Sequence, residues 1–218
     1  MTIRAVIFDL GGVVLGSPLH AIAAYERKNA IPENFVNRVV ANTAPGGAWS
    51  RLERGEIRMS QFFSDFEAEC QEAGKTIDAK QMFAEMAVAS QPRPAMLEAI
   101  ARIRARGLKT AALTNNWAPE PSPTSSSNAP DLKRHFDAFI ESSVEGLRKP
   151  DPRIYELACE RIGVQPTEAA FLDDIGANLK PARAMGMTTL RVVEPEATLR
   201  ELEAVLGFAL RDEPDGDG

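Results

Sequence analysis

The sequence alternates short apolar stretches with longer segments of helical periodicity, at its start and again from residue 94 onward. Strands separated by helices pair in parallel, because each connection must cross the sheet, and the helices then cover both faces. This alternation therefore predicts an α/β fold with a Rossmann-like, mostly parallel sheet. The strand candidates are residues 4–9, 109–116, 139–142, 169–174 and 188–193.

Helices and loops of this α/β part are predicted from their end signals. The clearest helix begins at Pro152, because Asp151 before it is a favourable N-cap. A second helix is predicted near residues 131–138. Residues 117–130 contain four prolines and four serines, which predicts a loop.

Residues 17–90 interrupt the alternation directly after the first strand and have a mostly helical pattern. The i, i+3, i+7 spacing of Phe63, Phe66 and Cys70 places these side chains on one helix face. Core packing accounts for the aromatic side chains of this insert, and the alternative is that some of them face a ligand. We expect a core domain and an inserted α-helical domain, with bounds 1–16 and 91–210 for the core, 17–90 for the insert and 211–218 for an acidic tail.

Composition argues against several classes of partner. The net charge of −6 and the pI near 5.1 disfavour nucleic acid and anionic membranes, which require a basic surface. Two cysteines far apart and two histidines disfavour a zinc cluster. The N-terminus lacks the apolar region of a signal peptide, and no segment approaches the ~18 apolar residues of a membrane helix. We expect a cytoplasmic protein whose partner is a small molecule.

Polar side chains follow three of the predicted strands, at the point where each strand ends. They are Asp9, the pair Thr114 and Asn115, and the pair Asp173 and Asp174. Ligands of open parallel sheets bind at the carboxyl ends of the strands. Carboxylates that converge there repel one another unless a cation or a proton lies between them, and oxygen ligands without His or Cys favour Mg²⁺.

Lys149 adds a positive charge in the segment 147-LRKPDP-152. An aspartate nucleophile, Mg²⁺ and a lysine together stabilise a phosphoryl group that moves onto the aspartate. Each motif alone has an ordinary structural explanation, such as a turn, a helix cap or a surface lysine. Their order and their placement at strand ends favour the functional interpretation.

With these motifs in this order, the sequence resembles the haloacid dehalogenase (HAD) superfamily of hydrolases over nearly its whole length. The phrases LTNNW, KPDPRIY and FLDDIGANLKPAR carry the resemblance, together with the strand that ends in Asp9. They are similar to the N-terminal phosphatase domain of soluble epoxide hydrolase and to the HAD domain fused to some acyl-CoA dehydrogenases. The insert at 17–90 resembles the α-helical cap of that superfamily.

The resemblance implies a metal site that contains Mg²⁺. Asp9 would be the nucleophile that forms an aspartyl-phosphate, and it would also be a metal ligand. Gly11 would give the metal its backbone carbonyl, and Asp174 would give it a carboxylate. Asp173 and Asn178 would support this metal site.

The resemblance also implies a phosphate site, in which Thr114 and Asn115 bind phosphoryl oxygens and Lys149 neutralises the nucleophile and the phosphate. One position departs from the family pattern. Phosphatases of this superfamily usually carry a second Asp two residues after the nucleophile, where it protonates the leaving group. This chain has Gly11 there, and the loss of such a group typically costs ~10²–10⁴-fold in rate.

We therefore predict a Mg²⁺-dependent phosphatase of a small phosphomonoester, slow because of Gly11. The first alternative is a catalytically impaired domain that binds phosphate or a metabolite and acts in regulation or beside a partner enzyme. A further alternative is a haloacid-type carbon–halogen hydrolase. That chemistry needs no metal, so the pair Asp173 and Asp174 argues against it.

Overall fold

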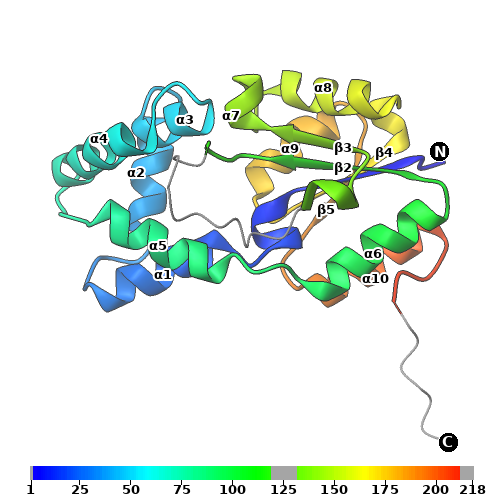
Figure 1. Cartoon of the computed structure of the whole chain (residues 1–218), viewed down its shortest axis with the longest axis horizontal. Coiled ribbons are helices and arrows are strands. Elements are labelled where there is room, and N and C mark those ends of the chain that lie inside the picture. Colours follow the sequence, from blue (N-terminus) through cyan, green and yellow to red (C-terminus); the bar gives the residue numbers. More distant parts are fainter. Residues whose placement is uncertain (1, 119–131, 212–218) are drawn as a thin grey trace, which may run out of the picture.

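A parallel sheet of five strands, in the order β3-β2-β1-β4-β5, forms the centre of the core (Figure 1). The computed structural model describes residues 2–118 and 132–211. The predicted α/β fold with a Rossmann-like sheet is confirmed, and each strand begins and ends within two residues of its predicted bounds. The strands are β1 (Ala5–Phe8), β2 (Lys109–Thr114), β3 (Ala138–Glu141), β4 (Ala169–Asp173) and β5 (Thr188–Arg191).

Helices cover both faces of the sheet, because successive residues of a strand point to opposite sides. Val6 and Phe8 belong to the apolar cluster beneath α6 and α10, whereas Ala5 and Ile7 belong to the cluster beneath α8 and α9. All four side chains are fully buried, which explains why β1 is apolar throughout. The helices of the core are α6 (Pro94–Ala105), α7 (Ser142–Glu145), α8 (Pro152–Ile162), α9 (Gly176–Ala184) and α10 (Pro195–Leu206), with short helical turns η1 (Leu10–Val14), η2 (Leu132–His135) and η3 (Pro166–Glu168).

Five further helices, which we call the helical unit, lie beside the sheet at the left of Figure 1. One face of α4 gives Phe62, Phe66 and Cys70 to a separate apolar cluster. The fully buried side chains follow the spacing i, i+4, i+8, and Phe63, predicted on the face of Phe66 and Cys70, is half-buried and packs against the same cluster. The helices of the unit are α1 (Pro18–Lys28), α2 (Phe35–Thr43), α3 (Ala48–Glu53), α4 (Met59–Glu72) and α5 (Ala79–Ala89).

The helix predicted near residues 131–138 is replaced by the short turn η2 and the beginning of β3. Asp137 explains the difference, because its backbone N–H donates to the carbonyl of Thr110 and its carboxylate accepts from the Thr110 N–H. These bonds draw the chain into the sheet. The predicted loop at 117–130 lies, apart from its first two residues, outside the described residues, as does the predicted acidic tail apart from its first residue.

The predicted cap of the helix that begins at Pro152 is confirmed. Asp151 caps α8, where its carboxylate accepts from the backbone N–H of Arg153. Cys70 and Cys159 are both buried free thiols. Among the described residues, no helix has both the length and the apolar character needed to cross a membrane.

The two linkers between the helical unit and the sheet run side by side. Leu15 and Pro92 form an antiparallel bridge, and the backbone N–H of Gly16 donates to the carbonyl of Gln91 at 2.9 Å. A Cβ atom at Gly16 would lie 2.0 Å from the carbonyl oxygen of Ala89. Glycine is therefore required for this close approach of the two backbones.

Replacing Gly16 with alanine is expected to lower the free energy of unfolding by about 1–3 kcal/mol, because the linkers must move apart to accept the methyl group. Denaturant unfolding measures the change. Gly46→Ala is the matched control, since a Cβ atom at Gly46 meets nothing within 4 Å. Equal stability of the two variants would contradict the close linker contact.

Candidate active site

The register of the sheet brings the predicted acidic residues together. Phe8 pairs with Leu172, so the residues that follow them, Asp9 and Asp173, lie side by side. The backbone N–H of Asp9 donates to the carbonyl of Leu172 at 2.9 Å. One carboxylate oxygen from each of Asp9, Asp173 and Asp174 lies within 4.8 Å of the others.

Lys149 is buried within this acidic cluster and is only 1% exposed. Its Nζ lies 2.8 Å from Oδ1 of Asp9 and 2.7 Å from Oδ2 of Asp173. Burial lowers the pKa of Lys149, but the charges of Asp9 and Asp173 raise that pKa by more than burial lowers it. The net shift is upward, so the ammonium is charged. Burial raises the pKa of Asp9; Lys149 opposes this shift, while Asp173 and Asp174 add to it.

Asp173 has both carboxylate oxygens occupied. Its Oδ1 accepts from the backbone N–H of Ile175 at 2.8 Å and from Nδ2 of Asn178 at 3.1 Å. Its Oδ2 accepts from Lys149 at 2.7 Å and again from Asn178 at 3.1 Å. Asn178 is itself buried on α9. Asp173 is thus a fixed counter-ion of Lys149, and Asn178 holds it in place.

Asp174, the next residue, differs from Asp173 in the hydrogen bonds of its carboxylate. Its Oδ1 is buried and has no hydrogen-bond partner within the described residues. Burial and the charge of Asp173 raise the pKa of Asp174 to about 6, against the opposing effects of Lys149 and of the Ser17 hydroxyl. The loop after β1 lies against this carboxylate, because a Cβ atom at Gly12 would be 2.1 Å from Oδ2 of Asp174.

These carboxylates fit a divalent cation. In the described structure, the contacts of Asp9 with the Leu10 N–H and with Lys149 both fall on Oδ1, so Oδ2 of Asp9 is available. Together with the unpartnered Oδ1 of Asp174, this gives two oxygen ligands in a cluster where three carboxylates face one lysine. The excess negative charge and the oxygen donors favour Mg²⁺. The role of the Gly11 carbonyl as a further ligand stays a prediction.

Thr114 is the last residue of β2 and Asn115 follows it. Both residues line the same cavity as the acidic cluster. Oδ1 of Asn115 accepts from the backbone N–H of Lys149 at 2.8 Å, and its Nδ2 donates to the Lys149 carbonyl at 3.1 Å. Thr114 is buried, and its hydroxyl makes one long contact of 3.4 Å with the carbonyl of Asn115. Asn115 thus ties the end of β2 to the Lys149 segment, and the phosphate contacts of both residues stay predictions.

The cavity above the cluster measures about 930 Å³ and extends into the helical unit. Its lining includes the aromatic side chains of Trp49, Phe63, Phe83 and Trp117. The ring of Trp117 lies 4.9 Å from that of Phe83 and 6.5 Å from that of Trp49. Some aromatic side chains of the insert therefore line the cavity that contains Asp9, as the alternative interpretation of these residues required.

Comparison with known proteins identifies the family. Residues 3–186 match the haloacid dehalogenase-like hydrolase family. The chain belongs to this family.

Three HAD relatives illustrate the match. Acyl-CoA dehydrogenase family member 10 of Mus musculus is 40% identical over 95% of this chain and 19% of its own length. Bifunctional epoxide hydrolase 2 of Sus scrofa is 35% identical over 98% of this chain and 40% of its own length. The chain thus spans less than half of these two proteins. Sesquiterpene phosphatase astK of Aspergillus oryzae is 27% identical over 94% of this chain and 98% of its own length.

Solved structures of HAD enzymes share the fold. The enzyme bt-2542 of Bacteroides thetaiotaomicron, in complex with magnesium and inorganic phosphate, has a TM-score of 0.58 at 20% identity, over 87% of this chain and 93% of that one. L-2-haloacid dehalogenase of Xanthobacter autotrophicus has a TM-score of 0.56 at 29% identity, over 93% of this chain and 83% of that one. The fold is therefore shared by a dehalogenase and by an enzyme seen with magnesium and inorganic phosphate.

Glu53 and Arg148 are charged residues of the cavity that were not found from the sequence. Glu53, at the end of α3, accepts from Nε of Arg148 at 2.6 Å and from Nε1 of Trp49 at 3.0 Å. Burial raises the pKa of Glu53, and Arg148 and Trp49 oppose this shift. Glu53 lies in the charged segment 51-RLERGE-56, a pattern typical of an exposed helix face. Arg148 lies next to Lys149 in the sequence, and this adjacency was the one sequence signal that could have assigned Arg148 to the site.

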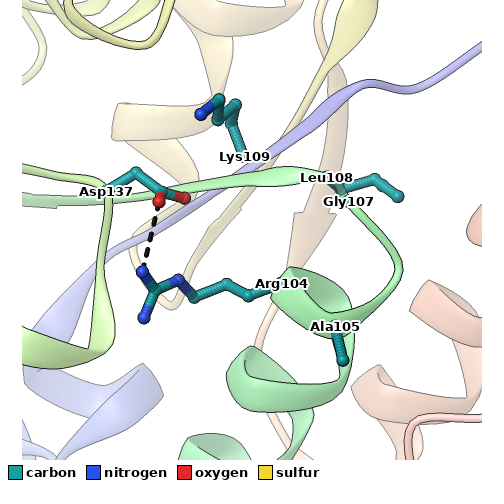
Figure 2. Close-up of a pocket in the computed structure, with 6 residues that line it drawn as sticks. All are labelled: Arg104, Ala105, Gly107, Leu108, Lys109 and Asp137. Carbon is teal, nitrogen blue, oxygen red and sulfur yellow. Dashed lines mark hydrogen bonds and ion pairs between the residues drawn. The ribbon is translucent and has the colours of Figure 1, made fainter.

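A second hollow lies at the opposite, amino-terminal end of β2, beside Lys109 (Figure 2). Its volume is about 380 Å³. Arg104 pairs with Asp137 there at 3.3 Å (Figure 2). Asp137 also accepts from the Thr110 N–H at 2.8 Å. These charged groups satisfy one another, so we place the chemistry at the carboxyl ends of the strands.

Replacing Lys149 with methionine is expected to lower the free energy of unfolding by about 3–5 kcal/mol near pH 8, because buried carboxylates lose their counter-ion. The loss should shrink toward about pH 5.5. A buried carboxyl whose pKa is raised, as for Asp9, holds its proton more tightly in the folded state, so stability falls as the pH rises toward that pKa. Denaturant unfolding at the two pH values measures both effects.

The matched control is Lys133→Met, which removes an exposed ion pair with Glu141. This variant should lose less than about 1 kcal/mol at either pH. An unchanged stability of the Lys149 variant near pH 8 would contradict a charged, buried lysine.

Proposed function

We propose that the chain is a Mg²⁺-dependent phosphatase that acts on a small phosphomonoester through an aspartyl-phosphate at Asp9. The observation that carries the proposal is the pairing of buried Lys149 with Asp9, beside the unpartnered oxygen of Asp174. A nucleophile, a fixed cation and a place for a metal ion are the parts that phosphoryl transfer requires. The similarity to a sesquiterpene phosphatase and to the bt-2542 enzyme, seen with magnesium and phosphate, supports this assignment.

In this mechanism a carboxylate oxygen of Asp9 attacks the phosphorus atom. The bond between phosphorus and the leaving oxygen breaks, and its electron pair departs with the leaving group. Water then cleaves the aspartyl-phosphate, which releases inorganic phosphate and restores Asp9. Lys149 and Thr114 would bind the phosphoryl oxygens throughout. Mg²⁺, held by Asp9, Asp174 and the Gly11 carbonyl, would neutralise charge on the transferring group.

The lining of the cavity favours a substrate with an apolar organic part. Trp49, Phe63, Phe83 and Trp117 lie in the same cavity as Asp9. Apolar groups gain free energy when they leave water for such a surface, and ligand cavities of this kind orient the ligand through a few polar groups. The similarity to a sesquiterpene phosphatase is consistent with an apolar phosphate ester.

Replacing Asp9 with asparagine should reduce phosphate release from an aryl phosphate to the uncatalysed background, because the amide is not a nucleophile. Removal of Mg²⁺ with a chelator should have the same effect on the wild type, and added Mg²⁺ should restore the rate. Phosphate release is measured with and without the metal. Asp65→Asn, which alters a partly exposed ion pair with Arg51, is the control.

A wild-type protein no faster than Asp9→Asn on sugar, lipid, nucleotide and acyl phosphates would overturn the phosphatase assignment. Binding of inorganic phosphate without turnover would instead support the alternative of an impaired binding domain, which the glycine at position 11 favours.

Replacing Gly11 with aspartate restores the carboxyl group that related phosphatases carry. Turnover of an alkyl phosphate should rise, by at most ~10²–10⁴-fold, because a poor leaving group gains a proton donor. A Cβ atom at Gly11 would lie 3.2 Å from Cδ of Pro18, so Pro18 must give way slightly. The double variant Gly11→Asp with Pro18→Ala should therefore gain more than Gly11→Asp alone.

The control reaction for these variants is the hydrolysis of an activated aryl phosphate, whose rate should change little because its leaving group needs no proton. If both variants fold and neither is faster on the alkyl phosphate, the missing acid is not what limits turnover.

A further inference from the structure

Glu53 is a buried carboxylate of the helical unit that reaches the loops of the core. Its Oε2 accepts from Nε of Arg148 at 2.6 Å and from Nδ2 of Asn115 at 3.4 Å. Nη1 of Arg148 also reaches the hydroxyl of Ser50, on the same helix α3, at 3.2 Å. Two segments of the core thus converge on one short helix of the helical unit.

The core segments that Glu53 contacts are the ones that carry the site. Arg148 directly precedes Lys149, and Asn115 directly follows Thr114. Asn115 bonds both the N–H and the carbonyl of Lys149, at 2.8 Å and 3.1 Å. Any movement of Arg148 or Asn115 is therefore passed through the backbone to Lys149.

The burial of Glu53 depends on the helical unit lying against the core. The side chain of Glu53 is 9% exposed and that of Arg148 is 20% exposed. A charge buried without its partner is strongly destabilising, whereas a pair that is hydrogen-bonded on several sides is tolerated. The pair with Arg148 therefore requires the helical unit to cover the cavity, as it does in this structure.

We propose that Glu53 is a positioning residue, whose ion pair with Arg148 couples closure of the helical unit to the placement of Lys149 and Asn115. The contacts carry the coupling itself, and its effect on catalysis rests on the proposed phosphatase function. We assign Glu53 no role as the acid missing at Gly11, because its two oxygens accept hydrogen bonds from Arg148, Trp49 and Asn115.

The first experiment compares kcat and KM on an aryl phosphate for Glu53→Gln, Arg148→Gln and the double variant. In Glu53→Gln, the side-chain NH₂ group would face the N–H donors that Glu53 now accepts from. The core segments that contain Arg148 and Asn115 would therefore shift. We expect kcat to fall by about tenfold to a hundredfold, because a displacement near 1 Å can cost that much. The double variant should be no worse than Arg148→Gln alone, since both changes remove one interaction.

The matched control is Glu26→Gln. Glu26 is as buried as Glu53 and also belongs to the helical unit, but it accepts from the backbone N–H groups of Asn34 and Val36, within that unit. This variant should lower the melting temperature while kcat stays at the wild-type value. Equal losses of kcat in Glu26→Gln and Glu53→Gln would reduce Glu53 to a general stabiliser and overturn the proposal.

The second experiment needs no catalytic activity. Spin labels on cysteines introduced at Lys75, in the helical unit, and at Glu156, on α8, report the distance between the two parts. Both positions are exposed. The native thiols stay unlabelled, because burial raises the pKa of Cys70 to about 12 and that of Cys159 to about 11.

The distance distribution should be narrow in the wild type and in Glu26→Gln, and broader in Glu53→Gln and Arg148→Gln. An inactive wild type with this broadening would refute the phosphatase function and leave the coupling intact. A narrow distribution with unchanged kcat in Glu53→Gln would overturn the coupling, whatever the substrate.

Discussion

The ammonium of Lys149, buried between Asp9 and Asp173, is the interaction on which the site depends. Withdrawing these charges from water costs several kcal/mol per ion, and only close, multiply bonded contacts offset that cost. The fold supplies such contacts from the ends of three strands. The register of β1 and β4 sets Asp9 beside Asp173, and Asn115 fixes the backbone of Lys149 from the end of β2. One lysine among three carboxylates still leaves excess negative charge, which makes a cation favourable there.

The neighbours Asp173 and Asp174 show how the local structure divides two identical side chains between two tasks. Asp173 ends β4 and points into the buried network, where Asn178 and Lys149 occupy both of its oxygens. Asp174 lies beyond the strand, against the loop at Gly12, and retains a buried oxygen that accepts no hydrogen bond from the described residues. The first is fixed by protein donors, and the second is left for a ligand. This division follows from the backbone positions, because the residue type is the same.

Sequence patterns were sufficient for the sheet and for the convergence of Asp9, Lys149 and Asp173, because buried strands and their polar ends leave local signals. The patterns failed where tertiary contacts decide. The side chain of Asp137 draws the chain into β3 where a helix was expected. The spacing of Phe63, Phe66 and Cys70 did not show that Phe62 is the fully buried residue while Phe63 also lines the cavity. Glu53 was missed because a glutamate in a charged segment is typical of an exposed surface, and only its tertiary contacts with Arg148, Trp49 and Asn115 explain its burial.

The helical unit and the glycine at position 11 together constrain the chemistry that the site can perform. The unit covers Asp9 with a largely apolar surface that includes Trp49 and Phe83. It also brings one carboxylate to the described cavity, Glu53, which accepts hydrogen bonds from Arg148 and Trp49. On the proposed mechanism, a leaving group therefore receives no proton from the residue at position 11. A leaving group that departs as an anion leaves most easily when its conjugate acid is strong. Selection among phosphate esters then rests on the acidity of the leaving group as well as on its fit to the cavity, and acyl or aryl phosphates satisfy the first condition better than alkyl phosphates do.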